Sequence, residues 1–573
     1  MEWTKCYAKL SANPDDFEQW KNLLAASDSL GGGLNKGTAE SDVQLFRFSY
    51  DNFLERFPLA FGYWIKYAET EFMLGNTEGA ETVFERGVGS NQVSVELWAA
   101  YARFKIRVCH NVDKMRAFLE RAVSHVGNHF YAHSIWDVYV DFERREAEIA
   151  TENKLARLAE LLSRIVRIPM HQYAKYFDLL RDISRQLKSD EMSWVKKGKD
   201  KSINNIYVST QAETARRWAY EQAFPRQYFH VLFVKEEDLQ AWRRYIDFEE
   251  SEGNLDRVRI LYERAIIATS HNEEMWLRYI RFMQTVSSAL RIHREEVSTL
   301  FRRACALLPI GRLEVRHLYA AHCEAVGELA LAHDIYMSIL GAFPNSIQTI
   351  LLFVNFERRY AYSQFLAQGK SVKKQAAVHQ AVQLLMQYLD DENSLRNVEK
   401  CEILQQLVDY LQVFPGQAPA NVRDILSRYE PALREEYKFW KLAMDYEIER
   451  VHKPVKDVSS MSFQETLTEL AAGEESSALA DEKTKRLSAI IDKVLESPLR
   501  LEDKRALLKR FLAYCIDQAS NVKDYEKYSA VLYNLGGIQT TPFAEPLDKP
   551  GDAAVSATVS ADTSATPVAA ESS

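Results

Sequence analysis

Cysteine, glycine and proline are all scarce in this chain of 573 residues, and each shortage excludes a class of protein. The six cysteines form no CxxC pair, which argues against a zinc module and a disulfide-rich secreted domain. They fit reduced, mostly buried thiols of a cytosolic or nuclear protein; they are Cys6, Cys109, Cys305, Cys323, Cys401 and Cys515. Only 21 glycines and 15 prolines argue against a loop-rich β protein.

Long apolar runs are missing as well. No stretch of about 18 apolar residues occurs, so we expect no membrane span. The N-terminus MEWTKCYAKL lacks the apolar segment of a signal peptide, so none is expected.

Positive charge is in short supply, because 81 acidic residues outnumber 72 lysines and arginines and leave a net charge of −9. A protein that coats nucleic acid with its whole surface would normally be basic. The balance therefore favours protein partners, with contact to RNA limited to a local basic patch. The hydrophobic fraction of 47% is that of a folded protein, and the length predicts several domains or a solenoid.

Catalytic motifs are absent from the sequence: there is no HExxH, no complete phosphate loop, no GxSxG and no metal-spaced Cys/His cluster. The segment from Gly32 to Thr38 lacks the lysine of a phosphate loop and is interpreted as a connection between helices. His129 and His133 have no third ligand nearby and are interpreted as structural. We therefore expect no enzyme activity, no cofactor and no metal.

Aromatic side chains are plentiful and fall in stripes, most clearly in residues 239–265, LQAWRRYIDFEESEGNLDRVRILYERA. Trp242, Tyr245 and Glu249 share one face of a predicted helix, because steps of three and four residues return to the same side. Gly253-Asn254 ends that helix, and a second amphipathic helix follows. The stripe is too large for one such helix–turn–helix unit to bury, and the same pattern returns along most of the chain.

The tryptophans define the period of this repeat. Trp64, Trp98 and Trp136 are 34 and 38 residues apart, and Trp276 follows Trp242 by 34. Periods in the thirties are typical of two-helix solenoid repeats. We predict an all-α, arched α-solenoid of about eleven to twelve helix–turn–helix repeats. Stacking on RNA bases is the alternative role for the aromatic residues, but their helical spacing favours core packing. The predicted repeat core comprises Trp64, Tyr67, Trp98, Tyr101, Trp136, Tyr139, Glu143, Trp242, Tyr245, Glu249, Trp276 and Tyr279.

Charged residues recur with the aromatic stripe. The recurring glutamates on first helices are Glu71, Glu143, Glu249, Glu357 and Glu447, and the recurring arginines on second helices are Arg86, Arg121, Arg264 and Arg303. Two interpretations stay open: pairs within or between units, or a solvated charged face. Exposed pairs would stabilise the fold by at most about 1 kcal/mol each.

The chain divides into predicted N-terminal repeats over 1–225, central repeats over 226–435 and C-terminal repeats over 436–538. A polar, basic insertion at about 188–205 is interpreted as a solvated loop, with RNA contact or nuclear import as the alternative. Its candidate contact residues are Lys196, Lys197, Lys199 and Lys201. A second polar insertion spans about 452–481. Residues 539–573 are rich in Ala, Ser, Thr, Val and Pro and predict a disordered tail.

The W-x2-Y-x2-F-E helix, seen at Trp136–Glu143 and Trp242–Glu249, and the second helix ending in YERA resemble the HAT (half-a-TPR) repeat. Residues 225–359, with Tyr228-Phe229-His230 as their most distinctive piece, resemble HAT proteins associated with the U1 snRNP. The resemblance implies a nuclear, non-enzymatic scaffold of pre-mRNA splicing that helps the U1 snRNP engage 5′ splice sites. It implies contacts with U1 snRNP proteins. Contact with RNA is expected to be indirect, and direct contact stays open as the alternative.

The same resemblance implies dimerisation through the C-terminal half, as a homodimer or with a related HAT protein. We place this contact between Trp440 and Tyr533, where an aromatic-rich end coincides with a decayed repeat. The candidate residues are Trp440, Tyr446, Phe511, Tyr514, Tyr525 and Tyr528. The alternatives are a HAT scaffold of mRNA 3′-end cleavage or ribosomal RNA processing, and a TPR-type peptide-binding adaptor. The adaptor would need a clamp of Lys, Arg and Asn on successive first helices, which the sequence does not show.

Overall fold

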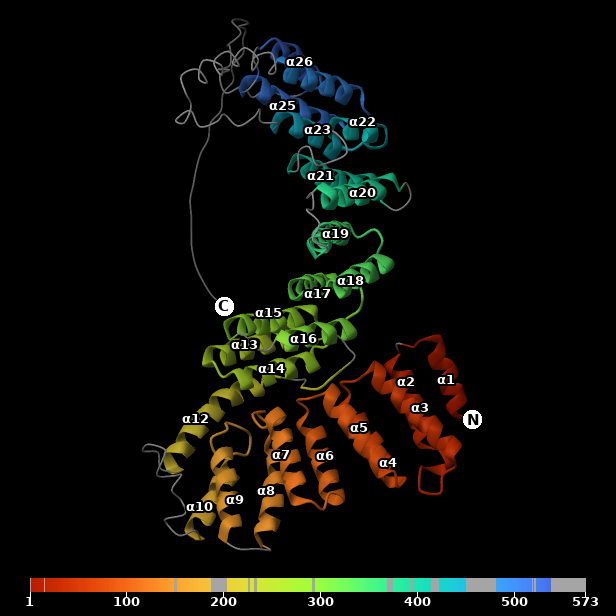
Figure 1. Cartoon of the computed structure of the whole chain (residues 1–573). Coiled ribbons are helices and arrows are strands. Elements are labelled where there is room, and N and C mark those ends of the chain that lie inside the picture. Colours follow the sequence, from red (N-terminus) through yellow and green to blue (C-terminus); the bar gives the residue numbers. More distant parts are fainter. Residues whose placement is uncertain are drawn as a thin grey trace, which may run out of the picture. The chain divides into compact units, whose positions relative to one another are not determined.

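The computed structural model of the chain is built from helices, and no strand occurs among the residues it describes. These are residues 2–14, 16–148, 152–186, 203–224, 227–230, 234–290, 294–367, 375–391, 395–413, 422–449, 481–517, 519 and 522–536. Successive helices form antiparallel pairs, as the sequence predicts (Figure 1). The prediction of an all-α solenoid is confirmed.

Two compact units make up the chain, Met1–Ile335 and Tyr336–Ser573. The boundary falls inside helix α18, Leu329–Ala342. It lies within the predicted central segment 226–435, and the three-part division derived from the sequence stays a prediction.

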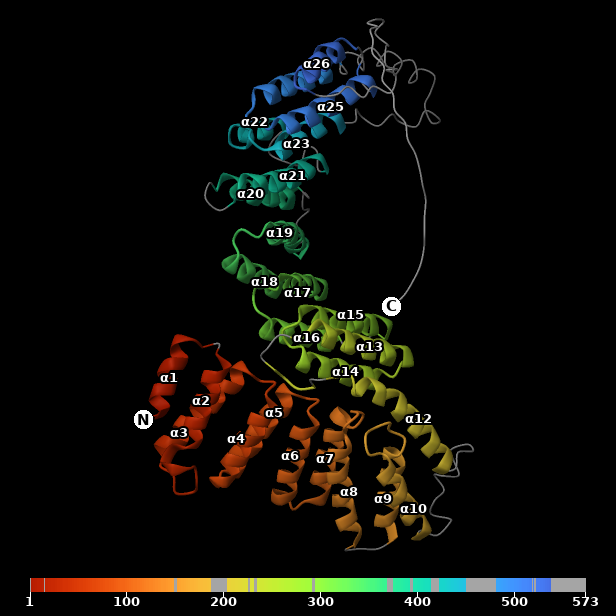
Figure 2. The ribbon, with the colours of Figure 1, turned by 180° about the vertical axis from the view of Figure 1, so that it is seen from behind.

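The first unit holds the helices that carry the clearest repeats. They are α1 Glu2–Ala12, α2 Phe17–Asp28, the short 3-10 helix η1 Leu30–Gly32, α3 Glu40–Arg56, α4 Phe61–Met73, α5 Thr77–Ser90, α6 Val95–Val108, α7 Val112–Val126, α8 His133–Glu148, α9 Glu152–Ile165, α10 Ala174–Gln186, α12 Ile203–Glu221, α13 Glu236–Glu252, α14 Leu255–Ala268, α15 Glu273–Leu290, α16 Arg294–Leu307 and α17 Leu313–Val326. From α4 to α9, helices adjacent in the chain lie side by side (Figure 2). Each first helix also contacts the next first helix, α4 with α6 and α6 with α8, which is the packing of a solenoid.

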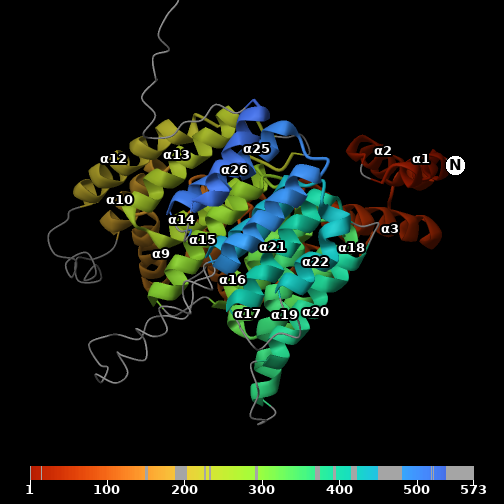
Figure 3. The same cartoon turned by 90° about the horizontal axis from the view of Figure 1, so that it is seen from above.

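The second unit continues with helix pairs of less regular sequence. They are α19 Ile347–Ala367, α20 Gln375–Asp390, α21 Asn397–Val413, α22 Val422–Leu433, α23 Tyr437–Glu449, a helix over residues 481–496, α25 Leu501–Asp517 and α26 Lys523–Asn534. Helices α20, α21 and α22 run beside one another when seen from above (Figure 3). The two terminal helices α25 and α26 also pack against each other.

A glycine–asparagine turn links the two helices of a repeat. Gly253 ends α13 with φ of 72°, a left-handed conformation that glycine adopts without steric cost. The side chain of Asn254 then accepts the backbone N–H of Arg257 at 3.1 Å and caps α14. Gly75, with φ of 91°, and Asn76 repeat this turn between α4 and α5. The two residues together reverse the chain and start the next helix.

Rings stack between neighbouring repeats as well as within them. Phe84 of α5 stacks on Tyr101 of α6 with ring centres 4.9 Å apart. Tyr262 of α14 stacks on Tyr279 of α15 at 4.8 Å. In both cases the second helix of one unit meets the first helix of the next. Because neither unit can bury these rings alone, each repeat depends on its neighbour for its core.

Two helix boundaries differ from the sequence-based expectation. Helix α1 precedes the first predicted repeat, and α12 begins at Ile203, so the last residues of the predicted insertion are helical. Tyr207 packs its ring 4.9 Å from that of Phe177. Polar Asn204 and Asn205 concealed this helix, whose apolar side, with Ile203 and Tyr207, packs on the core of the N-terminal repeats.

The cysteines and the apolar helices complete the description of the fold. All six cysteines are free thiols; Cys323, Cys401 and Cys515 are buried and the other three are half-buried. Within the described ranges, no helix combines the length and the apolar character needed to cross a membrane.

Candidate interaction sites

The tryptophans of the repeat motif lie between helices with almost no exposed surface. Five of them are at most 2% exposed: Trp64, Trp98, Trp136, Trp242 and Trp276. The indole N–H of Trp64 donates to the backbone carbonyl of Pro58 at 2.9 Å, and that of Trp98 to Gln92 at 2.8 Å. Trp276 does the same to Ser270 at 3.0 Å. In these three repeats the bond ties the loop that enters the first helix to the helix itself.

The carboxylate of Glu85, on the second helix α5, joins three consecutive helices. The hydroxyl of Tyr101 on α6 donates to Glu85 of α5 at 2.7 Å. The guanidinium of Arg121 on α7 donates to the other oxygen of Glu85, also at 2.7 Å, and lies 5.2 Å from the ring centre of Trp98. Burial alone would raise the pKa of Glu85, but the hydrogen bonds from Arg121 and Tyr101 lower it. Glu85 is thus held as a carboxylate by its neighbours.

The same arrangement recurs through the first unit, with an arginine over the motif tryptophan and a carboxylate from the preceding second helix. The sets are Arg86 with Asp51 over Trp64, Arg164 with Glu120 over Trp136, Arg264 with Glu221 over Trp242, and Arg303 with Glu263 over Trp276. These contacts run from one repeat to the next, so they hold neighbouring repeats together rather than the two helices of a single repeat.

The recurring glutamates of the first helices are buried, and four of the five pair with an arginine of the preceding repeat. Glu71 of α4 accepts two hydrogen bonds from Arg47 of α3, at 2.7 and 3.0 Å. The equivalent pairs are Glu143 with Arg116, Glu249 with Arg217, and Glu447 with Arg423. Glu357 of α19 differs, because it accepts from Gln380 of α20 within its own helix pair. Both recurring charged sets are therefore paired, but not with each other. Arg47, Arg116, Arg217 and Arg423 lie outside the aromatic stripe, so the repeat pattern in the sequence does not mark them.

The segment singled out as distinctive crosses between repeats inside the first unit. The hydroxyl of Tyr228 donates to Glu96 at 3.1 Å, and burial followed by the charge of Glu96 raises the pKa of Tyr228 to about 12. The ring of Phe229 lies 6.2 Å from that of Phe57 and 6.4 Å from that of His271. Residues 228–229 thus contact both the N-terminal and the central repeats.

His129 is buried in the loop before α8. Its Nδ1 atom accepts the backbone N–H of Tyr131 at 2.9 Å. Burial first, and then the charges of Arg264 and His133, lower the pKa of His129 well below its usual value. His133 begins α8, and no group of three or more His, Cys, Asp and Glu side chains is placed to hold a metal ion among the described residues.

The predicted dimer residues lie mostly inside the chain's own core. Trp440, Tyr446, Phe511, Tyr514 and Tyr528 are at most 8% exposed, and Tyr525 is half-buried. Tyr528, for example, donates to Asp492 at 2.8 Å within the same unit. Side chains that are already packed cannot supply a contact surface without rearrangement. The exposed apolar residues of this region are instead Leu501, Ile516, Val522 and Tyr533.

Several predicted features lie outside the described residues. These are the candidate contact residues Lys196, Lys197, Lys199 and Lys201, the polar insertion up to residue 480, and the tail from 539 onward. Their proposed roles remain predictions.

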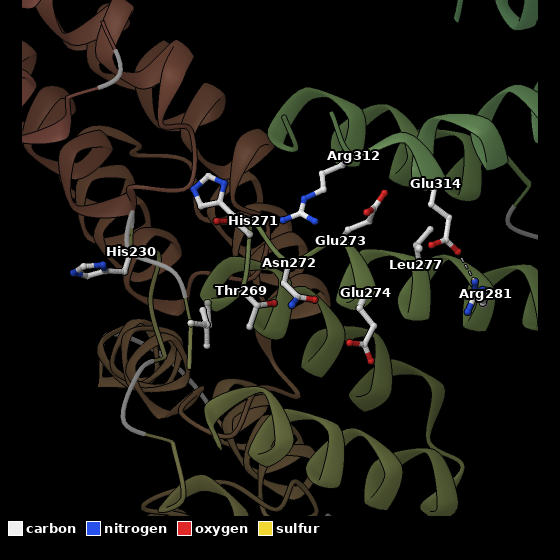
Figure 4. Close-up of a pocket in the computed structure, with 13 residues that line it drawn as sticks. His230, Thr269, His271, Asn272, Glu273, Glu274, Leu277, Arg281, Arg312 and Glu314 are labelled. Carbon is white, nitrogen blue, oxygen red and sulfur yellow. Dashed lines mark hydrogen bonds and ion pairs between the residues drawn. The ribbon is translucent and has the colours of Figure 1, made fainter. Parts of the chain in front are cut away.

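A groove that the sequence did not indicate lies in the first unit, between the α14–α15 loop and the start of α17 (Figure 4). Its volume is about 370 Å³. The lining residues are His230, Val234, Ala268, Thr269, Ser270, His271, Asn272, Glu273, Glu274, Leu277, Arg281, Arg312 and Glu314. We name it the Arg312 groove. No sequence signal marks it, because its lining comes from three separated segments.

Two known families match the repeats of the N-terminal and central parts of the chain. The family model described as PRP39 N-terminal HAT repeat matches residues 4–182, and that described as PRP39 C-terminal HAT repeat matches residues 215–359. Together they cover more than half of the chain.

Curated relatives carry related names. Pre-mRNA-processing factor 39 of Schizosaccharomyces pombe is 34% identical over 410 residues, which cover 65% of each chain. Its namesake in Homo sapiens is 24% identical over 411 residues, covering 63% of this chain and 58% of the relative. The U1 small nuclear ribonucleoprotein component PRP42 of Saccharomyces cerevisiae is 21% identical over 388 residues, covering 62% of this chain and 69% of the relative. The chain therefore spans less than two thirds of the first two relatives.

Among solved structures, one titled as the crystal structure of CSTF-77 aligns with 70% of this chain and 94% of that chain, at 11% identity. The TM-score of that alignment is 0.29, which is too low to support a conclusion.

Proposed function

Because the chain belongs to the PRP39 family of HAT-repeat proteins, we propose that it is a nuclear scaffold of pre-mRNA splicing that acts with the U1 snRNP in 5′ splice-site recognition. The observation that carries the proposal is the match to both PRP39 repeat families in order along one chain. The relative named as a U1 small nuclear ribonucleoprotein component supports the same assembly. In this role the protein binds other proteins and performs no chemistry itself.

The recurrent polar side chains bond to one another between helices, which supports a scaffold role. Glu85, Arg121 and their equivalents are bonded to each other between helices, and so are Glu71 and Arg47. Side chains engaged in this way hold the repeats in register and leave the helical surfaces for partners. Contact with proteins of the U1 snRNP is the expected use of those surfaces, and RNA contact is indirect.

Self-association through the C-terminal repeats is part of the proposal. The exposed Ile516, Val522 and Tyr533 support it, because each is 57% exposed or more and apolar surface on helix ends favours burial. Light scattering after size exclusion should give twice the chain mass for the full protein. A chain ending at residue 435 should be monomeric, and its dimerisation would show that the contact lies elsewhere. The same measurement with an added related HAT protein distinguishes a homodimer from a heterodimer.

The function is tested by recovering the tagged protein from nuclear extract, with sequencing of the bound small RNAs and mass spectrometry of the bound proteins. We expect U1 RNA and its core proteins to be enriched over a tagged TPR protein used as control. Enrichment of 3′-end cleavage factors or ribosomal RNA precursors instead would contradict the assignment and favour the alternative HAT scaffolds.

A further inference from the structure

We propose that the Arg312 groove and the apolar channel beside it bind an extended segment of a partner protein that carries one acidic residue next to a large apolar one. The inference rests on the proposed scaffold function, to which it adds a binding site and the chemistry of the segment bound. The apolar channel is lined by Pro14, Trp20, Asn52, Glu55, Arg56, Phe57, Pro58, Leu59, Phe229, His271 and residues 306–309, and its volume is about 780 Å³. His271 lines both spaces, so they adjoin.

Of the two arginines that line the groove, Arg312 is the one available to a ligand, because Arg281 pairs with Glu314. Arg312 lies just before α17 and is exposed, and no hydrogen-bond or ion-pair partner of its guanidinium occurs in the described ranges. Figure 4 shows its side chain extending toward His271 and Asn272. Because a guanidinium offers paired donors that match a carboxylate, an aspartate or glutamate side chain is the natural ligand.

The glutamates of the groove are already engaged by other groups. The contacts are Glu274 with Arg243 at 2.6 Å, Glu314 with Arg281 at 3.2 Å, and Glu273 with the backbone N–H of Val315 at 3.0 Å. Glu273 thereby caps the start of α17, whose preceding residue Arg312 supplies no side-chain cap. The groove therefore has an unpaired positive charge, whereas each of its negative charges has a partner.

Ser270 supplies an independent sign that a ligand belongs here. The residue is 2% exposed and lines the groove, and its hydroxyl has no hydrogen-bond partner among the described residues. A buried hydroxyl without a partner is unfavourable, so native proteins rarely leave one. A carbonyl or carboxylate oxygen of a bound segment would accept a hydrogen bond from this hydroxyl.

The channel beyond His271 is mostly apolar. Phe57, Phe229 and Leu307 contribute apolar surface beside Pro58 and Pro309. Large apolar side chains gain most from such a surface, since the gain is proportional to the area removed from water. The segment that fits therefore carries a large apolar residue next to its acidic one.

The charges around the groove favour a peptide over RNA. Two arginines and three glutamates line it, so a chain of phosphates would meet more like charge than opposite charge. A single carboxylate beside Arg312 avoids that repulsion. A protein segment also brings the apolar side chain that the adjoining channel accommodates, whereas a phosphodiester backbone does not.

The proposal is tested by selecting a library of random 12-residue peptides, displayed on their own mRNA, against the full-length protein and then measuring Kd for the selected peptides by fluorescence anisotropy. The variants are Arg312→Glu and Ser270→Ala in the groove and Ala306→Lys in the channel. The matched control is Arg107→Glu, which reverses an exposed charge on α6 away from the lining residues.

We expect the selected peptides to carry Asp or Glu beside a large apolar residue. Arg312→Glu should weaken binding by at least about tenfold, as should replacement of the peptide's acid by its amide. Ala306→Lys should also weaken binding, while Arg107→Glu should bind like the unmodified protein. Ser270→Ala should weaken binding without lowering the melting temperature, because the hydroxyl that it removes has no partner within the protein. If Ser270 had only a structural role, the melting temperature would fall and the Kd for the peptide would not rise.

Equal binding by Arg312→Glu and the unmodified protein, or the absence of acidic peptides after selection, would overturn the proposal. The proposal would also be overturned, in favour of a nucleic-acid ligand, if the protein bound no peptide but bound a 15-nucleotide RNA and Arg312→Glu abolished that RNA binding. The selection uses random peptides and no component of the U1 snRNP, so its result does not depend on the U1 assignment. If the nuclear-extract experiment fails, the peptide-binding result therefore still tests the groove.

Discussion

Two neighbouring arginines on α12 allow the stabilising effect of burial to be measured directly. Arg217 and Arg216 each pair with a glutamate of α13, but in different surroundings. The side chains of Arg217 and Glu249 are 2% and 3% exposed, whereas those of Arg216 and Glu252 are 47% and 25% exposed. The perturbations are Arg217→Met and Arg216→Met, which remove the charge at adjacent positions of one helix.

The expected magnitudes follow from what each change leaves behind. Arg217 donates to Glu249 at 2.6 and 3.2 Å, and without it the buried carboxylate retains only Arg257, whose Nε lies at 3.4 Å. Removing one partner of a buried pair costs about 3–5 kcal/mol, and the remaining arginine places this case at about 3. An exposed pair such as Arg216–Glu252 contributes at most about 1 kcal/mol. The difference of about 2 kcal/mol is a change of about thirtyfold in a local opening constant.

Hydrogen–deuterium exchange of peptides from α12 and α13, read by mass spectrometry, measures that opening in the full-length protein. Arg217→Met should raise the exchange of both helices far more than Arg216→Met. The double variant Arg217→Met with Glu249→Leu should recover most of the protection, because it removes the uncompensated charge. Equal exchange in the two single variants would refute the reasoning that burial sets the strength of these inter-repeat pairs.

Three further predictions concern the repeat core and its histidine. Gly89→Ala should stabilise α5 by about 0.5–1 kcal/mol, because an added Cβ meets nothing within 4 Å there. In Gly87→Ala the added Cβ would lie 3.1 Å from the motif residue Trp64, so this gain should be lost. Thermal melting of both variants checks the difference. Trp136→Ala should cost about 3–5 kcal/mol and Trp218→Ala, at a site 38% exposed, about 1–2 kcal/mol, measured by urea denaturation; equal losses would contradict the assigned burial. Below about pH 6.5 the unfolded chain gains a proton at His129 that the folded chain does not, so stability should fall by about 1.4 kcal/mol per pH unit. His129→Gln should lack that component when denaturation at about pH 7.5 and pH 5.5 is compared, and an unchanged pH dependence would show that His129 is protonated in the fold.

The surface contacts were harder to anticipate than the fold. The pairing of the recurring charges was left open by the sequence, since Glu71 and Arg47 lie 24 residues apart and meet only after two repeats stack. The proposed dimer residues show the opposite problem: Phe511 and Tyr528 look like interface aromatics in sequence, but the chain buries them itself. An aromatic side chain in a decayed repeat does not reveal from sequence whether its own neighbours cover it.

The sequence by itself determined the helical class, the period and the turns, because these depend on residues close together in the chain. The step of three and four residues between Trp242, Tyr245 and Glu249 defines a helical face, and Gly253-Asn254 ends the helix wherever it lies in space. Tertiary structure alone decided which charges pair between repeats and that a groove forms at Arg312. Those features require segments as distant as residues 230 and 314 to meet, and their contact depends on how successive helix pairs stack rather than on any local pattern.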